Sequence, residues 1–211
     1  MTSISRAGPD PNDAAGASSV ASLLEEVRAV ADEAVREDGR SPLNEATLLS
    51  LRHDGLAGKA LWVARDPGGS LTGFALVAEA GGEAEANLVV APAARRAGVG
   101  RALAQQALEA YADVPVTAWS HGNHPAAARL ATALGFERVR DLWVMRRPLS
   151  PEHPLPPVEP AGGTVVRTFR PGQDEDAFLA LNAEAFVDHP EQGSMTRADL
   201  EARMAEPWFD P

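Results

Sequence analysis

A chain of 211 residues, of which 45% are hydrophobic and 23% charged, is long enough for one complete globular domain and part of a second. The formal net charge of −11 argues against nucleic acid or an anionic membrane as the main partner, because both require a broad basic surface. The sequence contains no cysteine, which excludes disulfides, thiolate metal sites and a cysteinyl acyl-enzyme. The five histidines show no metal-binding spacing, so we expect no metal.

The beginning of the chain has the composition of a disordered segment. Residues 1–17 are rich in Ala, Gly, Pro, Asp and Asn, and they lack the cationic start and apolar core of a secretory signal. No stretch of the sequence approaches the roughly 20 apolar residues that cross a bilayer. We therefore expect a disordered leader over residues 1–17, a cytoplasmic location and a monomer.

Residues 18–149 alternate between helix and strand patterns and are expected to form one α/β domain. Apolar residues at spacings of three and four predict a helix over 18–37, and Asn44 can cap a short second helix. The remaining expected elements are strands over 61–66, 71–80, 85–92, 115–122 and 137–149, and helices over 98–112 and 125–136. This order predicts a mixed central sheet flanked by helices.

The last part of the chain is expected to be a linker followed by an unfinished domain. The prolines of residues 150–163 remove backbone donors and favour a semi-rigid, extended linker. Residues 164–211 contain too few elements for a full sheet, and a compact domain needs roughly 50 residues or more. The expected elements there are a strand over 164–170, a helix over 174–186 and a helix that opens at Thr196, with Asp199 completing a weak capping pair. We therefore expect the incomplete N-terminal part of a second domain.

One glycine-bearing loop has the features of an anion-binding site. Arg95-x-x-Gly98-x-Gly100 stands between an apolar strand and a helix. Glycines let the backbone turn tightly, so that several N–H groups point to one place at a helix N-terminus, where the helix dipole also favours negative charge. Arg95, Arg96 and Arg101 add positive charge in an acidic protein. The pattern predicts a pyrophosphate site.

This strand, loop and helix resemble the acetyl-CoA-binding motif of the GNAT superfamily, and the resemblance extends over residues 61–149. It implies the GNAT fold, acetyl-CoA as cosubstrate, and direct attack of a free amine on the thioester, without a covalent enzyme intermediate. It also implies that the backbone groups of Leu88, Val89 and Val90 pair with the acetyl-pantetheine arm. The residues implied to wrap the pyrophosphate are Arg96, Ala97, Gly98, Val99, Gly100 and Arg101.

A closer resemblance is to the mycothiol synthase family, whose members contain two tandem GNAT domains. The stretches that resemble it are Asp38-Gly39-x-x-Pro42-x-x-Glu45, LVV with RRAGVG, WSHG at 119–122, HPEQG at 189–193 and the terminal WFDP. The family acetylates the cysteinyl amine of desacetylmycothiol, a cysteine–glucosamine–inositol conjugate. The resemblance implies that Glu45 and Glu191 contact this substrate, since a carboxylate can pair with an ammonium or accept hydrogen bonds from sugar hydroxyls. The alternatives are a first-turn helix acid for Glu45 and a solvated loop acid for Glu191.

The sequence departs from the GNAT pattern at the positions that supply catalytic groups. Aligned on Leu134-Gly135-Phe136, His124 stands where these enzymes often have Asn, and Ala131 stands where they often have a proton-donating Tyr. Alanine cannot donate a proton, so the first domain is expected to bind acetyl-CoA without catalysing transfer, and the catalytic acid and base are expected beyond Pro211. Two alternatives stay open: a GNAT enzyme that acetylates a protein N-terminus or another small amine, and a non-catalytic CoA-binding module.

Overall fold

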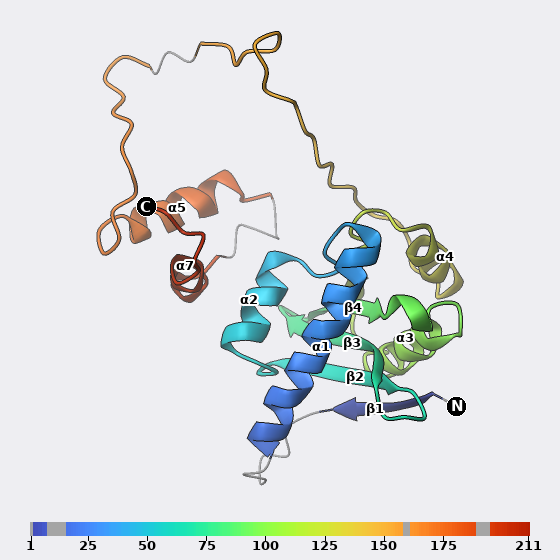
Figure 1. Cartoon of the computed structure of the whole chain (residues 1–211). Coiled ribbons are helices and arrows are strands. Elements are labelled where there is room, and N and C mark those ends of the chain that lie inside the picture. The colour runs from blue at the N-terminus through green and yellow to red at the C-terminus, as the bar shows by residue number, and fades with distance from the viewer. Residues whose placement is uncertain (1, 8–15, 158–160, 189–194) are drawn as a thin grey trace. The chain divides into compact units, whose positions relative to one another are not determined.

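The computed structural model describes residues 2–7, 16–157, 161–188 and 195–211. The chain divides into two compact units, Met1–Arg138 and Val139–Pro211, here called unit 1 and unit 2. Figure 1 shows the helices and strands of each unit.

Unit 1 is built on a five-stranded sheet in the order β1-β2-β3-β4-β5. The first four strands pair antiparallel, whereas β5 runs parallel to β4. The strands are β1 (Ser3–Ala7), β2 (Lys59–Arg65), β3 (Leu71–Ala80), β4 (Glu83–Val90) and β5 (Val116–Ala118). Consecutive residues in the middle of β2 and β3 are buried, so both faces of the sheet are covered there.

Helices cover the two faces of this sheet, as Figure 1 shows. On one face, α1 (Gly16–Asp38) and α2 (Glu45–His53) contribute apolar side chains to a core that includes Leu61, Phe74 and Val89. On the other face, α3 (Val99–Ala110) contributes Leu103 and Ala107 to a second core with Trp62 and Val77, here called the α3-side core. The expectation of a mixed sheet between helices is therefore confirmed.

The prediction that residues 1–17 are disordered is wrong for Ser3–Ala7. Ser3–Ala7 form β1, which pairs with β2 from Ser3↔Arg65 to Ala7↔Leu61. Ile4 packs against the α3-side core, and the guanidinium carbon of Arg6 lies 5.4 Å from the ring centroid of Trp62. A short polar strand at a sheet edge gives little signal in composition, because its partner supplies most of the interaction.

Local capping signals place several helices correctly. The side chain of Asn44 accepts a hydrogen bond from the Thr47 N–H at 2.7 Å, which starts α2 one residue later. Pro125 opens α4 (Pro125–Ala133), and His124 caps it by accepting from the Ala126 N–H at 3.1 Å. Between Thr196 and Asp199 the full capping box is present, and it starts α7 (Arg197–Met204).

Two expected strands are absent. Residues 137–149 and 164–170 contain no strand, and unit 1 ends at Arg138 rather than at 149. Val139, Trp143 and Met145 are 86%, 82% and 90% exposed, so in the described part of the chain no neighbouring element covers this segment. A strand forms only where another strand accepts its backbone hydrogen bonds, and an alternating pattern does not provide that partner.

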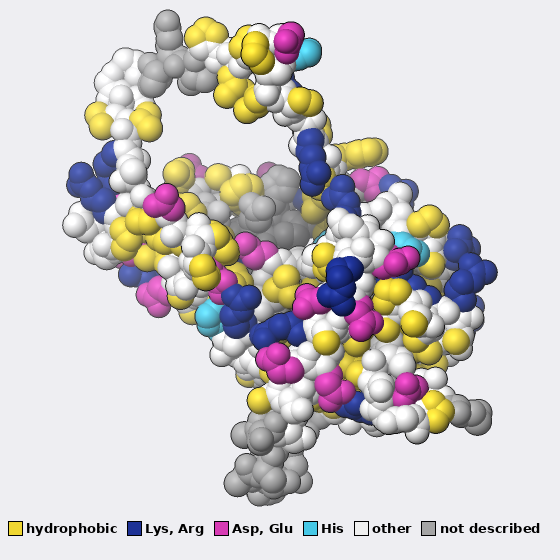
Figure 2. Space-filling model, in the orientation of Figure 1, with side chains coloured by type: hydrophobic (Ala, Val, Ile, Leu, Met, Phe, Trp, Pro, Cys, Tyr) yellow, Lys and Arg dark blue, Asp and Glu magenta, His cyan; other side chains and the backbone are white. Residues whose placement is uncertain are grey.

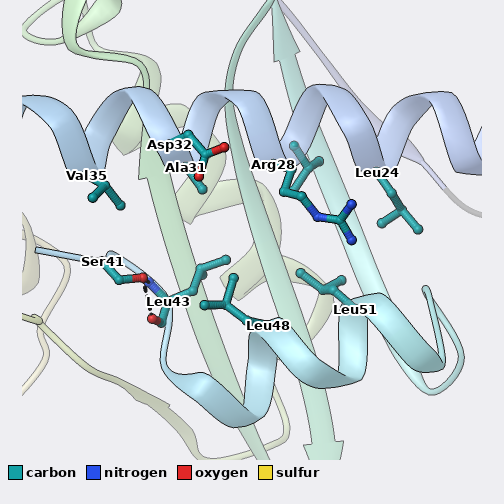
Figure 3. Close-up of a pocket in the computed structure, with 10 residues that line it drawn as sticks. Leu24, Arg28, Ala31, Asp32, Val35, Ser41, Leu43, Leu48 and Leu51 are labelled. Carbon is teal, nitrogen blue, oxygen red and sulfur yellow. Dashed lines mark hydrogen bonds between the residues drawn. The ribbon is translucent and has the colours of Figure 1, made fainter. Parts of the chain in front are cut away.

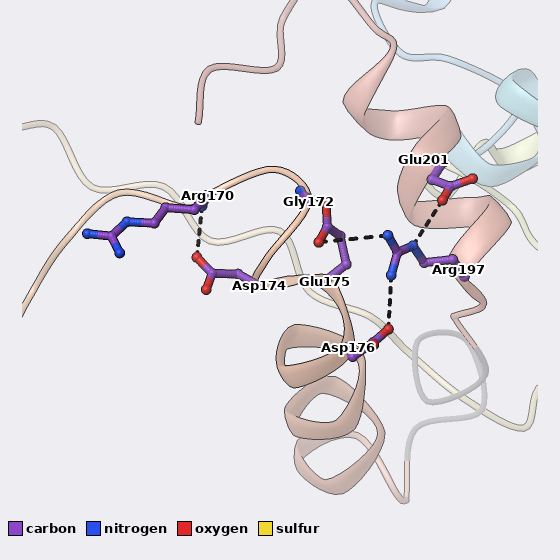
Figure 4. A network of polar contacts seen from close by, with 7 residues as sticks. All are labelled: Arg170, Gly172, Asp174, Glu175, Asp176, Arg197 and Glu201. Carbon is purple, nitrogen blue, oxygen red and sulfur yellow. Dashed lines mark hydrogen bonds and ion pairs between the residues drawn. The ribbon is translucent and has the colours of Figure 1, made fainter.

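Unit 2 has two helices, α5 (Glu175–Ala185) and α7, in the part of it that the structure describes. Figure 4 shows Arg197 of α7 among three carboxylates of α5 and α7, with its nitrogens 3.8 Å from Glu175, 2.9 Å from Asp176 and 2.9 Å from Glu201. A small aromatic cluster adds to this contact, because Phe169 packs edge-on against two other rings, Phe178 and Phe209. Figure 2 shows hydrophobic side chains gathered over α5, where Leu181 is 65% exposed.

None of the helices in the described ranges combines the length and apolarity required to traverse a lipid bilayer.

The α3-side core generates a stability prediction. Leu103 is fully buried, and one of its methyl groups lies 3.2 Å from where a Cβ on Gly73 would stand. Replacing Leu103 by Ala leaves a cavity between α3 and the sheet, so we expect unit 1 to lose about 2–5 kcal/mol in urea unfolding. Leu149→Ala is the control, because Leu149 is 66% exposed and should change stability by no more than about 0.5 kcal/mol. Equal effects of the two substitutions would contradict this packing.

Candidate functional site

The β4–β5 pair is incomplete at the end where β4 meets the glycine-bearing loop. β5 pairs with β4 only from Ala84↔Val116 to Ala86↔Ala118, whereas β4 continues to Val90. Among the described residues, no strand pairs with Asn87–Val90 on this side. We call these four residues, on their β5 side, the open edge of β4.

The hydrogen-bond register decides which peptide groups face the open edge. Val89 pairs with Phe74, and the Ala91 N–H donates to the Thr72 carbonyl at 2.9 Å. In an antiparallel ladder only alternate residues bond to a given neighbour, so the peptide groups of Leu88 and Val90 point away from β3. They point toward the open edge.

The register bears on the expectation that the backbone groups of Leu88, Val89 and Val90 pair with the acetyl-pantetheine arm. The backbone of Val89 is used by β3, and its side chain is 3% exposed in the core beneath α1. The pairing role expected of all three residues therefore falls on Leu88 and Val90, with Val89 fixing the spacing between them. That either of them pairs with a ligand stays a prediction.

The glycine-bearing loop brings the first amides of α3 next to the open edge, and they have no backbone acceptor among the described residues. Gly98 has φ = 84°, in the left-handed region, and Arg96 before it also has a positive φ of 66°. The Ala102 N–H makes the first intrahelical bond of α3, to the Gly98 carbonyl at 3.0 Å, so the earlier amides of the first turn have no helical acceptor. They belong to Val99, Gly100 and Arg101. The side chains of Arg96, Ala97 and Arg101 are exposed, so an anion could reach these groups from solvent.

Gly100 also sets how closely α3 approaches β4. A Cβ at this position would stand 3.4 Å from Val90 Cγ2 and 3.9 Å from Leu88 Cδ2. The start of α3 therefore lies directly against the side chains of the two residues whose peptide groups face the open edge. The amides of the helix terminus and those of β4 belong to one local structure.

The guanidinium of Arg95 is hydrogen-bonded within the protein. Its guanidinium makes a bidentate ion pair with Asp38 at the end of α1, with Nη1–Oδ1 and Nη2–Oδ2 distances of 2.7 and 2.8 Å. Its Nε donates to the Val90 carbonyl at 3.2 Å. The hydrogen bond from Arg95 is the main cause that lowers the pKa of Asp38 below its ordinary value. The positive charge of Arg95 is therefore compensated by Asp38. Of the three arginines of this motif, Arg96 and Arg101 are the exposed ones.

Three sequence motifs that lie far apart in the chain meet here. Besides the Asp38–Arg95 pair, the α1–α2 connection contacts the segment after β5, because a Cβ on Gly122 would stand 2.8 Å from Arg40 Cδ. His124 lies close enough to Asp38 for its charge to lower the pKa of that carboxyl. The Asp38-Gly39 motif, the glycine-bearing loop and WSHG thus surround the same end of β4.

A polar group beside this end of the sheet was not recognised from the sequence. His121 Nε2 is buried and has no hydrogen-bond partner in the part of the chain that the structure describes. Burial lowers the pKa of His121, which the negative charge of Glu85 opposes, so the imidazole is neutral at pH 7. Asn87, 6% exposed, donates to Glu85 at 3.3 Å. The only signal in the sequence was the WSHG resemblance, which gave no role for the imidazole.

The expected substrate and catalytic positions have different outcomes. Glu45 is an exposed first-turn residue of α2, so its contact with substrate stays a prediction. Glu191 lies outside the described residues, as does the rest of HPEQG. Ala131 is in α4 and supplies no proton donor.

A separate hollow of about 220 Å³ lies between α1 and α2. Figure 3 shows the side chains of Leu24, Arg28 and Val35 directed from α1 toward α2. Its lining is mostly aliphatic, and Arg28 is paired with Glu25 at 3.0 Å. Such a hollow offers few groups that could orient a charged ligand, so the open edge of β4 is the better candidate site. Within the described ranges, no three His, Asp or Glu side chains are placed to hold a metal ion.

The Asp38–Arg95 pair generates a prediction on pH dependence. Its side chains are 27% and 26% exposed, so we expect Asp38→Asn to destabilise unit 1 by roughly 0.5–1 kcal/mol at neutral pH. Because folding lowers the pKa of Asp38, the stabilisation is complete above its unfolded value of 3.8 and is lost as the pH falls through the folded value. Urea unfolding at about pH 7 and about pH 3 should show the difference between wild type and variant shrinking in acid. A difference that grows in acid would contradict the pairing.

Comparison with known proteins agrees with this architecture. Residues 57–138 match the family model described as an acetyltransferase (GNAT) domain. Two solved structures share the fold: a GNAT-family acetyltransferase from Staphylococcus aureus, with a TM-score of 0.52 and 11% identity, and the ribosomal-protein-S18-alanine N-acetyltransferase from Escherichia coli, with a TM-score of 0.50 and 21% identity. Each covers 66% of this chain, and this chain covers 87% and 80% of them. At these identities the likeness extends to the fold alone.

Much higher identities are found with curated mycothiol acetyltransferases, another name for the mycothiol synthases. The protein from Geodermatophilus obscurus is 47% identical over 96% of this chain, that from Salinispora tropica 48% over 89%, and that from Thermobispora bispora 49% over 89%. The chain spans 60–64% of the length of these three relatives. The chain therefore contains a GNAT acetyltransferase domain, and over the part of their length that it spans it is a relative of the mycothiol acetyltransferases.

Proposed function

We propose that unit 1 binds acetyl-CoA, with the pantetheine arm along the open edge of β4 and the pyrophosphate at residues 96–101. The observation that supports this most directly is the register of β4, which leaves the peptide groups of Leu88 and Val90 facing away from β3 where β5 has ended. An amide-containing arm can pair with such an edge as a further strand would. The unpaired amides at the start of α3 favour the diphosphate that follows the arm.

The intact protein, we infer, acetylates the cysteinyl amine of desacetylmycothiol. The support is the name of its relatives together with 47–49% identity over 89–96% of this chain. In the reaction the amine nitrogen attacks the thioester carbonyl carbon, the C–S bond breaks, and one proton passes from the amine to the departing thiolate. No enzyme thiol is needed, which is compatible with a sequence that has no cysteine. A cytoplasmic location fits this metabolic role.

Unit 1 is proposed to bind the cosubstrate without transferring the acetyl group. Ala131 stands where a proton donor is expected, and it cannot protonate the thiolate. The catalytic acid and base then belong to the part of the relatives that this chain does not span. A small-molecule amine is the acceptor, and Glu45 and Glu191 remain the candidates to contact it.

Cosubstrate binding is tested at Gly98. Gly98→Val places a β-branched residue at φ = 84°, so the loop must rearrange and we expect CoA affinity to fall at least about 10-fold in isothermal titration calorimetry. Gly69→Val is the matched control, because Gly69 has φ = 88° in the β2–β3 turn, with no atom within 4 Å of its built Cβ. Both variants carry the same backbone strain, and only the first should change binding. Undiminished CoA binding by Gly98→Val would contradict the proposed site.

The acceptor is tested by product formation. With acetyl-CoA and either desacetylmycothiol or a peptide with a free N-terminus, we expect this chain to form no acetylated product, because unit 1 lacks the proton donor. The Geodermatophilus obscurus relative, assayed in parallel, should acetylate desacetylmycothiol. Transfer by this chain to the peptide alone would favour a GNAT enzyme of another specificity.

A further inference from the structure

The side chain of Arg95 makes three hydrogen bonds beside the open edge of β4. Two of its nitrogens donate to the two carboxylate oxygens of Asp38 at 2.7 and 2.8 Å, and the third, Nε, donates to the Val90 carbonyl at 3.2 Å. Asp38 is the last residue of α1, whereas Val90 is the last residue of β4. One guanidinium therefore joins two elements that are separated by more than 50 positions in the sequence.

Arg95 contacts β4 at its last residue, Val90. The Val90 carbonyl points toward the open edge, because the peptide groups of Val90 face away from β3. Arg95 donates to this carbonyl, which leaves the Val90 N–H and the peptide groups of Leu88 for the pantetheine arm. It also stands immediately before the exposed loop residues Arg96 and Ala97. Both the end of the strand and the beginning of the loop are held by the same side chain.

The geometry of the pair favours a fixed orientation over simple charge attraction. A planar guanidinium that meets a carboxylate through two parallel N–H···O bonds has one preferred arrangement, whereas a lysine ammonium would act as a point charge. The hydrogen bonds that Arg95 donates to Asp38 are the main cause that raises the pKa of Arg95, and the negative charge of Glu37 acts in the same direction. The imidazole of His124, in front of α4, also lies near Asp38.

We propose that Asp38 and Arg95 are a pair of positioning residues: they do not contact CoA, and they hold the end of β4 and the start of the pyrophosphate loop against the end of α1. This inference rests on the proposed CoA site. It also makes the α1–α2 connection, which begins after Asp38 and leads to Glu45, energetically dependent on the same contact that orders the cosubstrate site. Such a dependence is reciprocal, so CoA binding stabilises the arrangement of the α1–α2 connection.

The opposite role for Arg95 is direct binding of a CoA phosphate. The two roles predict changes of opposite sign for Asp38→Asn. If Arg95 bound phosphate, removal of the competing carboxylate would free the guanidinium, remove a nearby negative charge and tighten CoA binding. If the pair positions the loop, loss of the bidentate contact leaves Arg95 unanchored and weakens CoA binding.

The experiment measures CoA affinity of the whole chain by isothermal titration calorimetry. For Asp38→Asn we expect affinity about 3- to 10-fold lower than wild type. Arg95→Lys keeps the charge and loses the fork, and it should weaken binding to a similar extent. Asp32→Asn is the matched control, because it removes the same charge from an exposed residue of α1, and it should leave affinity within about 2-fold.

Salt dependence separates a positioning residue from a phosphate ligand. Arg101→Gln removes a charge at the loop, so CoA affinity should become less sensitive to salt between about 50 and 500 mM. The double variant Asp38→Asn/Arg95→Gln keeps the net charge beside the loop, so it should lower affinity and leave the salt sensitivity of wild type unchanged. Thermal melts of each variant, followed by circular dichroism, show whether it is folded at the temperature of the titration.

Each outcome decides between the two roles. Unchanged or tighter CoA binding by Asp38→Asn would overturn the inference, and so would a reduced salt sensitivity in the double variant Asp38→Asn/Arg95→Gln. If these results appear while Gly98→Val still abolishes binding, the CoA site stands and only the positioning role is lost. If the wild-type chain does not bind CoA, both the site and the inference are overturned.

Discussion

Hydrogen bonding between β3 and β4 uses only every second residue of β4, and the residues in between present their peptide groups to the opposite side. Over Ala84–Ala86 that side is taken by β5. From Asn87 onward it is not, so the register of a buried ladder decides which groups of unit 1 can meet a ligand. Gly100, Arg95 and the start of α3 all lie against this one strand end, where the cosubstrate is proposed to bind.

Much of unit 1 could be predicted because its signals are local. Asn44 and Pro125 start their helices by bonds or fixed dihedrals within a few residues, and the glycine pattern of the loop correctly indicates a sharp turn before α3. The two strands expected at 137–149 and 164–170 failed for the converse reason. Alternation tells which face of a strand would be buried, but a strand also requires a neighbour with free backbone groups. The neighbour is a property of the whole fold, and no window of sequence contains it.

The candidate site shows the same division between local and tertiary information. The amides before Ala102 follow from the loop and the start of a helix, and these are local features. Which arginine faces the ligand depends on where Asp38 lies, and Asp38 is brought to the site by the packing of α1 on the sheet. The sequence therefore predicted the place of the cationic loop but not which of its cations is compensated. His121 is a comparable case, because its neutral state results from burial that only the fold creates.

β5 is short, and its length decides how firmly it is attached to β4. Only three residue pairs join β5 to β4, and two of the three β5 residues, Thr117 and Ala118, are exposed. Few backbone hydrogen bonds must break for β5 to separate from β4, whereas β2 and β3 are packed between two hydrophobic cores. Unit 1 thus has a sheet centre that is packed on both faces and one edge strand that is held by few pairings. Separating β5 from β4 would therefore break fewer backbone pairings than separating any two neighbours among β1–β4.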